Sequence, residues 1–498
     1  MRLWLSLLFL SSLGFSSAAE SARPNVLLIY ADDQSYKTVG CYPESWPWVK
    51  TPNIDALAKT GVRFHAAYLG SWCMPSRASI LTGRHPHGIE SMTMEGKYPG
   101  STYDPTKCRF APAEMRKQGY HTAQIGKWHT GTDSGWARDW DRQIVWNRPL
   151  HPENAGAYYE TQIVSEDGVE RTQEGYPADN YTKWATDYIK GEKRDKSKPW
   201  YLWLCYGSIH GPSKPAARHK GMYKDGQVPL PKDIFPPRSG KPAYLNKTQS
   251  WIEGEDGMPI AKKGGEAFGE AKRGLRFDDW VRQMNECLPA VDEGVGQLVQ
   301  TLKETGQYDN TVVIYTADQG FGMGEHGFRT KLAPYDTNYR SPLIVSMPSK
   351  IAQDKVCPQA INGPDLVATI LSFMQVTVPW PLHGRDITLL LKQPQASWEH
   401  PVLYEHMDRL YGADARTAAE ARSGKTDNQV PRYAAVVLGG WKYIHYLDTQ
   451  SGEELYDLKT DPDELNNLAA NPEHKAKLTS LRTAMESELQ RTEGFALK

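Results

Sequence analysis

The sequence predicts an α/β fold in which a large, mainly parallel sheet is sandwiched by helices, followed by a smaller C-terminal α+β subdomain with an antiparallel sheet. Two observations support this prediction. Near-continuous apolar runs, typical of strands buried on both faces, alternate with helical patterns along most of the chain. Closer to the C-terminus, two further runs flank a Gly-Gly pair, which is typical of a β-hairpin.

The first nineteen residues are expected to lie outside the fold. Arg2 is followed by an apolar stretch over residues 3–15, and Ser17, Ala18 and Ala19 form a small-residue cleavage site. This pattern is typical of a secretory signal peptide, and its apolar part is shorter than the roughly 20 residues of a membrane-spanning helix. We therefore expect an exported protein, periplasmic, secreted or lumenal, without stable membrane insertion. An uncleaved anchor is the alternative.

The remaining chain exceeds the size that one hydrophobic core usually supports. We expect a large N-terminal domain at residues 20–395, after the signal peptide at 1–19, and a C-terminal subdomain at 396–498. A net charge of -1 and the absence of a basic tract argue against a nucleic-acid partner. Of six cysteines, Cys73 belongs to a motif described below, and the odd number that remains argues against a disulfide scaffold. The sequence leaves disulfide pairing and oligomeric state open.

Four apolar runs are the predicted strands of the large sheet, and polar residues follow each of them. The runs cover residues 25–31, 120–125, 200–206 and 311–317. In parallel sheets ligands bind at the carboxyl ends of the strands, so we expect one shared site there. The polar residues that follow the four runs are Asp32 and Asp33, then Lys127 and His129, then His210, and finally Asp318 and Gln319.

Helical patterns separate the predicted strands. One begins with Pro52 in its first turn and is expected to end at Gly61. Another covers about residues 279–304, with a bend or break at Pro289. These helices would cover the faces of the sheet.

The C-terminal subdomain is predicted from a hairpin and a closing helix. Residues 433–438 and 441–446 flank the Gly-Gly pair at 439–440, and another short run follows at 454–458. A charged helix is expected at about residues 472–490.

Cys73 begins the most informative motif in the chain, Cys-Met-Pro-Ser-Arg-Ala-Ser-Ile-Leu-Thr-Gly-Arg. Pro75 suits the first turn of a helix that Gly83 would end, so Cys73 is expected at a helix N-terminus that favours anions. A buried structural cysteine is the alternative interpretation. The motif resembles the signature of type I, formylglycine-dependent sulfatases of the alkaline phosphatase-like superfamily. This resemblance implies that a formylglycine-generating maturation enzyme oxidises Cys73 to Cα-formylglycine, whose hydrated aldehyde is the nucleophile.

Oxygen ligands indicate a hard cation next to this cysteine. Asp32 with Asp33, and Asp318 with Gln319, offer carboxylate and amide oxygens, which suit Ca²⁺ or Mg²⁺ better than Zn²⁺. Taken alone, the first pair would more often be a turn or a helix cap. The resemblance implies one Ca²⁺ ion, with the modified Cys73 as a further ligand.

The resemblance also assigns roles to the cationic residues and histidines. Arg77 would pair with the hydrated aldehyde and the metal-binding carboxylates. Lys127 would contact both nucleophile and sulfate, and His129 would accept a proton when sulfate leaves. His210 and Lys331 match sulfate-binding positions, and one of them would protonate the leaving alcohol. Four residues near these motifs are expected to be supporting structure: His85, His87, Glu325 and His326.

The function that follows is hydrolysis of a sulfate monoester on a sulfated small molecule or glycan, with a carbohydrate preferred. Residues 211–274 form a long segment without clear periodicity, which we expect to contribute to specificity. A formylglycine-dependent phosphonate or phosphate monoester hydrolase is one alternative, and a secreted binder of sulfated glycans is another. Five residues would either bind sugar or pack a loop: Trp136, Arg138, Trp140, Asp141 and Trp146.

Overall fold

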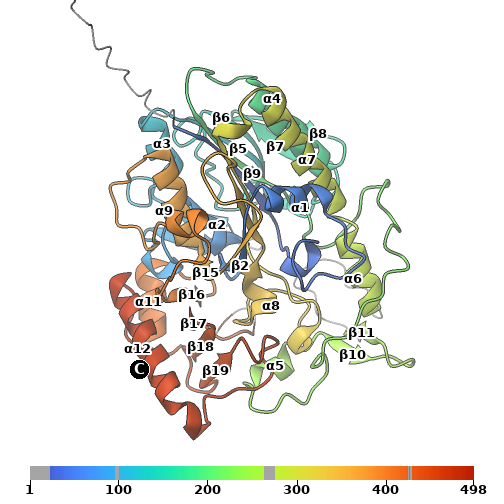
Figure 1. The fold of residues 1–498 in the computed structure, drawn as a ribbon, viewed down its shortest axis with the longest axis vertical. Coiled ribbons are helices and arrows are strands. Elements are labelled where there is room, and N and C mark those ends of the chain that lie inside the picture. The colour runs from blue at the N-terminus through green and yellow to red at the C-terminus, as the bar shows by residue number, and fades with distance from the viewer. Residues whose placement is uncertain (1–22, 96–99, 263–274, 424–425, 427–428, 498) are drawn as a thin grey trace, which may run out of the picture.

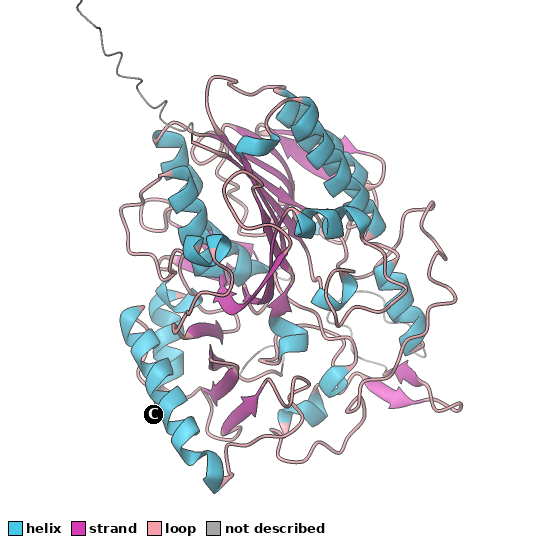
Figure 2. Cartoon of the chain, viewed as in Figure 1, coloured by secondary structure: helices cyan, strands magenta, loops and turns pink. Residues whose placement is uncertain are grey.

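The computed structural model describes all residues except 1–22, 96–99, 263–274, 424–425, 427–428 and 498. A large twisted sheet lies between two layers of helices, and a small antiparallel sheet lies below it (Figures 1 and 2). This arrangement confirms the predicted α/β class. The predicted signal peptide lies outside the described residues. Within the described part of the chain, none of the helices combines the length and the apolar character that a bilayer crossing requires.

The centre of the large sheet is parallel. Strands β12, β1, β9, β5 and β6 lie side by side in that order and all pair in parallel. The four predicted strands are therefore neighbours, and their carboxyl ends share one edge. Their bounds are β1 (Asn25–Ala31), β5 (His121–Trp128), β6 (Arg142–Asn147), β9 (Trp200–Cys205) and β12 (Thr311–Ala317).

Shorter strands extend both edges of the sheet. On one side β14 pairs antiparallel with β12, and β2, β13 and β15 follow; on the other, β7 and β8 form an antiparallel extension of β6. Their bounds are β2 (Gly61–Tyr68), β13 (Arg340–Ser341), β14 (Leu343–Ser346), β15 (Lys355–Asn362), β7 (Gln162–Glu166) and β8 (Val169–Gln173).

Alternate residues of the central strand pack into two separate cores. Leu27 and Ile29 of β1 pack on one face with α1, α4 and α7, whereas Val26 and Leu28 pack on the other with α2, α3 and α9. Because successive strand residues point to opposite faces, a continuous apolar run is what this position requires. The helices are α1 (Pro52–Lys59), α2 (Cys73–Thr82), α3 (Ala111–Lys117), α4 (Pro177–Lys190), α7 (Pro289–Glu304) and α9 (Gly363–Met374).

Three boundaries bear on the sequence predictions. The second predicted strand continues to Trp128, so Lys127 lies inside the strand and not after it. Gly61 begins β2 rather than ending α1, whose C-cap is Thr60. Pro289 does break the predicted long helix, because α6 (Phe277–Asn285) ends before it and α7 starts at it.

The small sheet contains the predicted hairpin. Its four strands pair antiparallel in sequence order, and α12 packs on one face while the other face packs against the large domain. The predicted boundary between residues 395 and 396 stays a prediction. The elements are β16 (Val402–His406), β17 (Tyr433–Leu438), β18 (Trp441–Tyr446), β19 (Glu453–Asp457), α11 (Gly412–Glu420) and α12 (Lys475–Arg491).

The remaining elements are short and lie in the connections. All six cysteines are among the described residues, and the structure pairs none of these six in a disulfide. The short elements are β3 (Met92–Glu95), β4 (Gly100–Tyr103), β10 (Trp251–Glu253), β11 (Pro259–Ala261), α5 (Tyr244–Lys247), α8 (Asp336–Tyr339) and α10 (Thr388–Lys392).

Gly126 provides a test of the strand register next to Lys127. Its φ is +101°, and a Cβ there would lie 2.1 Å from the carbonyl oxygen of Cys205 in β9. We expect Gly126→Ala to reduce the free energy of unfolding by about 2–5 kcal/mol, because positive φ and a backbone clash add together. Thermal or urea unfolding measures the change.

Gly221→Ala is the matched control. Gly221 also has a positive φ of +80°, but nothing lies within 4 Å of the position that a Cβ would take there, so we expect a loss of about 1 kcal/mol. Equal destabilisation by the two substitutions would contradict the close β5–β9 contact.

Candidate active site

Acidic residues from two neighbouring strands meet at the carboxyl edge of the sheet. Asp32 and Asp33 follow β1, Asp318 and Gln319 follow β12, and all four are fully buried. The backbone N–H of Asp33 donates to Asp318 Oδ1 over 3.0 Å. The backbone N–H of Asp32 donates to the carbonyl of Ser208, which follows β9. These bonds fix the carboxylates to the ends of three parallel strands.

Cys73, the first residue of α2, lies against this acidic group. Its Sγ is 3.3 Å from Asp32 Oδ1 and 3.8 Å from Asp33 Oδ1, and only 2% of the residue is exposed. Burial, reinforced by the Asp32 carboxylate, raises the pKa of the thiol to about 12. An unmodified Cys73 would therefore be protonated at neutral pH and would be a weak nucleophile.

Two buried cations pair with the carboxylates from the side of α2 and β5. Arg77, one turn after Cys73, places Nη2 3.1 Å from Asp318 Oδ2 and 3.8 Å from Asp32 Oδ1. Lys127 forms an ion pair with Asp32. Arg77 Nη1 also donates to the Lys127 carbonyl over 3.3 Å, which couples the two cations to one another.

Lys331 is the third buried cation. It forms an ion pair with Asp33, and its Nζ lies 2.9 Å from Cys73 Sγ. Burial alone would lower the pKa of Lys331, but Asp33 and the other acidic groups raise it above its usual range. The ammonium group is therefore held beside the sulfur of Cys73 in its charged form.

The three carboxyl groups differ in how far nearby positive charges offset the effect of burial on their pKa values. Burial would raise the pKa of Asp32, but the positive charges of Lys127 and Arg77 hold it well below its usual range. Burial raises the pKa of Asp318 to about 8, and the neighbouring Asp32 carboxylate adds to the rise. Burial also raises the pKa of Asp33. The acidic group as a whole therefore favours additional positive charge.

The donor atoms fit a hard metal ion. Ligand atoms of Asp32, Asp33, Asp318 and Cys73 all lie within 4.8 Å of one another. Among the described residues, the buried oxygens Asp33 Oδ2 and Gln319 Oε1 receive no hydrogen bond, although His210 Nε2 is 3.5 Å from the former. Buried oxygens without donors are costly unless a cation binds them, and an oxygen-rich set suits Ca²⁺ or Mg²⁺.

The two predicted histidines line the same site. His210 stacks on Tyr158 with ring centroids 4.0 Å apart, and its Nδ1 lies 2.6 Å from the Gly211 carbonyl, so Nδ1 carries a proton. Burial lowers the pKa of His210 well below its usual range. Burial, followed by the charge of Arg148, does the same for the pKa of His129. Both rings are therefore neutral at neutral pH.

Two residues of the site, Arg148 and Tyr158, were not predicted from the sequence. Arg148 Nη1 lies 3.1 Å from His129 Nε2, and its guanidinium lies 4.9 Å from the centre of the Tyr158 ring. Lys127 Nζ lies 5.3 Å from the same ring. Arg148 directly follows β6. Had β6 been predicted as a strand of the parallel sheet, Arg148 would have been expected in the site, because ligands bind at the carboxyl ends of such strands. No motif indicated Tyr158, which lies in irregular structure.

For most of the aromatic cluster the packing interpretation is correct. Trp140 and Trp146 are fully buried, and the ring of Trp140 stacks against those of Tyr201 and Trp203. The predicted stacking of Trp140 and Trp146 on sugar is therefore wrong, since the core covers both side chains. Arg138 forms ion pairs with Asp133 and Asp139, Asp141 pairs with Arg116, and Trp136 is half-buried.

The four residues predicted to be supporting structure have structural partners. His87 Nδ1 lies 2.8 Å from Glu405, and the backbone N–H of His85 donates to His383. Partners of the other two are Asp233 for His326 and Lys37 for Glu325.

Comparisons with known proteins show the family to which the chain is similar. Residues 24–376 match the Sulfatase family, and residues 324–492 match a family described as N-sulphoglucosamine sulphohydrolase, C-terminal. The chain is 27% identical to an N-acetylglucosamine-6-O-sulfatase from Bacteroides thetaiotaomicron, over 97% of this chain and 89% of that protein.

Two solved structures are informative. One, described as a complex with its substrate D-glucosamine-2-N,6-O-disulfate, is 25% identical with a TM-score of 0.79 and covers 95% of this chain and 98% of its own. The other, a phosphonate monoester hydrolase from Agrobacterium radiobacter, is 19% identical with a TM-score of 0.68 and covers 94% and 96%. The second likeness shows the fold alone.

Metal binding can be tested through stability, independently of turnover. We expect Ca²⁺ to raise the melting temperature of chelator-treated protein by a few degrees, since binding at a hundred times Kd stabilises by about 2.7 kcal/mol. Asp318→Asn removes a ligand and is expected to abolish most of this rise. Differential scanning calorimetry with EDTA or with Ca²⁺ measures both effects.

Asp225→Asn, at an exposed position, is the control and is expected to keep the full response. A melting temperature that does not change with Ca²⁺ or Mg²⁺ would contradict the metal site.

Proposed function

Since the chain belongs to the sulfatase family, and is thus a sulfuric ester hydrolase, we propose that it removes a sulfate group from a sulfated carbohydrate through a modified Cys73 and one bound Ca²⁺. The observation that supports this most strongly is the convergence of Cys73, three carboxylates and three cations at one buried edge of the sheet. The components come from segments far apart in the chain, namely the ends of β1 and β12, the start of α2, β5 and the turn before α8, and together they form a site for an anionic ester.

Maturation of Cys73 to formylglycine is part of the proposal. Its support is the twelve-residue motif that Cys73 begins and the burial that keeps the unmodified thiol protonated. When present, the hydrated aldehyde would supply a hydroxyl nucleophile and a second hydroxyl for release of the sulfate. The position at the start of α2 places residue 73 where helix N–H groups favour an anion.

The metal would be held by Asp32, Asp33, Asp318 and Gln319, with residue 73 beside them. Bound there, Ca²⁺ would offset negative charge on the ester and favour ionisation of the nucleophile. Gln319 would present its amide oxygen, which accepts no hydrogen bond from the described residues, toward the ion.

The three cations would bind the sulfate group and the charge that develops on it. The carboxylates of Asp32, Asp33 and Asp318 pair with Arg77, Lys127 and Lys331, so a divalent ion bound beside them would make the site more positive. Lys331 and Lys127 both hold their ammonium groups at the acidic cluster beside Cys73. Preorganised positive charge of this kind stabilises an anionic transition state without reorganisation of solvent.

The histidines would move protons. A neutral His129 can accept a proton from residue 73, and Arg148 holds its ring in place. The leaving alcohol would receive its proton from His210 or Lys331, which both lie at Asp33; Lys331 carries that proton already, whereas His210 would first have to gain a second proton at Nε2. The stacking of His210 on Tyr158 fixes the ring plane in which this transfer would occur.

A sulfated glucosamine is the substrate class that the relatives favour. The relative from Bacteroides thetaiotaomicron is named for action on N-acetylglucosamine 6-O-sulfate, and the solved relative holds a glucosamine disulfate. We therefore propose a 6-O-sulfated glucosamine residue as the first substrate to test. We further propose that the chain is exported, on the basis of the signal-peptide pattern in residues 1–19.

Loss of residue 73 tests the nucleophile. We expect Cys73→Ala to lower kcat on a sulfate ester by more than about a thousandfold, because the attacking group is gone, while binding of a sulfated oligosaccharide is retained. Steady-state kinetics and calorimetric binding measure the two effects. Cys41→Ala, which removes a partly exposed thiol outside the site, is the control and should leave kcat unchanged; activity that survived Cys73→Ala would reject the mechanism.

A substrate panel tests the reaction class. We expect nitrophenyl sulfate to be hydrolysed with a higher kcat/KM than its phosphate and phenyl phosphonate analogues, and 6-O-sulfated glucosamine to exceed its 3-O-sulfated isomer. Released sulfate and sugar are quantified by ion chromatography. A clear preference for the phosphonate would replace the sulfatase proposal by the phosphonate hydrolase alternative.

A further inference from the structure

The backbone directly after Lys331 has an unfavourable conformation. Leu332 has a φ of +88° and is buried, with 5% of its surface exposed. Branched residues rarely adopt positive φ, and such strain persists only where the surrounding structure holds it in place. Because Leu332 adjoins Lys331, the same restraint fixes the point from which the lysine side chain reaches Cys73.

The small antiparallel sheet supplies that restraint. The hydroxyl of Tyr433, in β17, donates to the carbonyl of Leu332 over 2.6 Å. Among the described residues, this is the one hydrogen bond that the Leu332 carbonyl receives. Two residues further on, the Pro334 carbonyl accepts from the Tyr404 hydroxyl over 2.6 Å and from Lys442 Nζ over 3.3 Å. The donors lie on three strands of the sheet, β16, β17 and β18.

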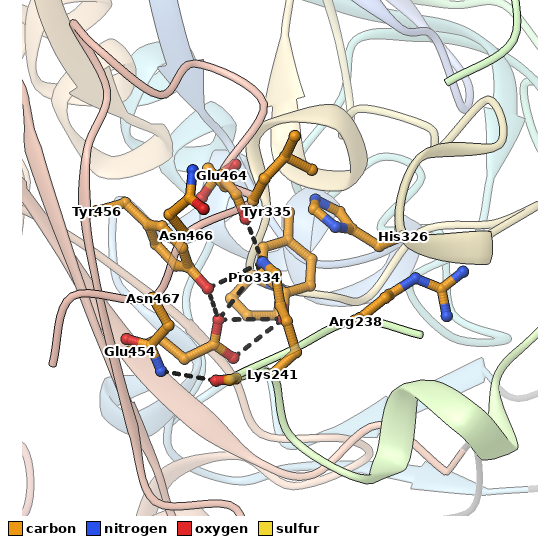
Figure 3. A network of polar contacts seen from close by, with 12 residues as sticks. Arg238, Lys241, His326, Pro334, Tyr335, Glu454, Tyr456, Glu464, Asn466 and Asn467 are labelled. Carbon is orange, nitrogen blue, oxygen red and sulfur yellow. Dashed lines mark hydrogen bonds and ion pairs between the residues drawn. The ribbon is translucent and has the colours of Figure 1, made fainter. Parts of the chain in front are cut away.

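The far end of the same segment is held by buried polar groups (Figure 3). The Tyr335 hydroxyl donates to Glu454 Oε1, in β19, over 3.0 Å. Lys241, from the long segment that follows His210, lies 4.1 Å from the centre of the Tyr335 ring. The backbone N–H of Asp336 donates to Glu464 over 2.6 Å. Residues 332–336 are thus attached to the subdomain at four successive points along the chain.

We propose that the small sheet sets the position of Lys331, and that Tyr433 is the positioning residue through its hydrogen bond to Leu332. The inference rests on the proposed role of Lys331 in sulfate binding. The C-terminal subdomain would then affect sulfate binding through the position of Lys331, without contacting the substrate itself. Without the Tyr433 hydroxyl, the Leu332 carbonyl loses its partner, the strained turn relaxes, and the ammonium group moves away from residue 73.

The test compares two tyrosine variants of the same sheet. Tyr433→Phe is expected to raise KM for nitrophenyl sulfate and Ki for inorganic sulfate by about five- to thirtyfold, with kcat changed less. Tyr443→Phe is the matched control: Tyr443 is also a buried residue, but it packs on the opposite face of the sheet and its hydroxyl bonds to the partly exposed Glu453. It is expected to lower stability by a similar amount and to leave KM and Ki unchanged.

A double variant of Tyr433 and Lys331 distinguishes a displaced Lys331 from a general loss of stability. Lys331→Ala alone is expected to raise the Ki of sulfate, and adding Tyr433→Phe to it should raise Ki no further. If Tyr433→Phe does not fold, Tyr404→Phe provides the same test with a smaller expected rise, because Pro334 keeps its bond from Lys442.

Two results would overturn the inference. If Lys331→Ala raises Ki while Tyr433→Phe and Tyr404→Phe keep wild-type KM and Ki, the positioning role is wrong and the proposed function stands. If Lys331→Ala leaves Ki unchanged, the sulfate-binding role of Lys331 is wrong, and the inference falls with it.

Discussion

The site depends on a balance of charge that is almost entirely removed from water. Three carboxylates and three cationic side chains lie within one buried cluster, and each charge would be costly to bury without its partners. The three cations that pair with these carboxylates come from different elements of the fold. Arg77 comes from α2, Lys127 from β5 and Lys331 from the turn before α8. An added divalent ion would increase the positive charge of this cluster, which favours binding of a sulfate monoester anion.

Topology explains how residues from distant parts of the sequence reach this cluster. The parallel order of β12, β1, β9 and β5 brings four carboxyl ends to one edge, and the start of α2 closes it. The C-terminal sheet lies behind the turn that carries Lys331 and holds it by hydroxyl and carboxylate groups. The fold thus separates two tasks: the large sheet gathers the acidic residues, and the small sheet fixes one of the cations against them.

Much of this arrangement could be predicted from the sequence, because buried parallel strands produce long apolar runs and their polar successors share one edge. Arg148 was missed because β6, Arg142–Asn147, begins with two polar residues and contains an apolar run of only three, which is too short to indicate a buried strand. Tyr158 and Tyr433 were missed because their roles depend on contacts between segments far apart in the chain. Trp140 and Trp146 could not be assigned from sequence, since aromatic residues serve equally well in a core and in a sugar-binding site.

We propose that residue 73 acts as an oxidised cysteine inside this charge cluster. Tandem mass spectrometry of the peptide that contains residue 73, across preparations made with different amounts of maturation enzyme, tests it most directly. We predict that specific activity rises in proportion to the fraction of aldehyde at that position. Full activity in a preparation whose residue 73 is entirely a thiol would contradict the claim.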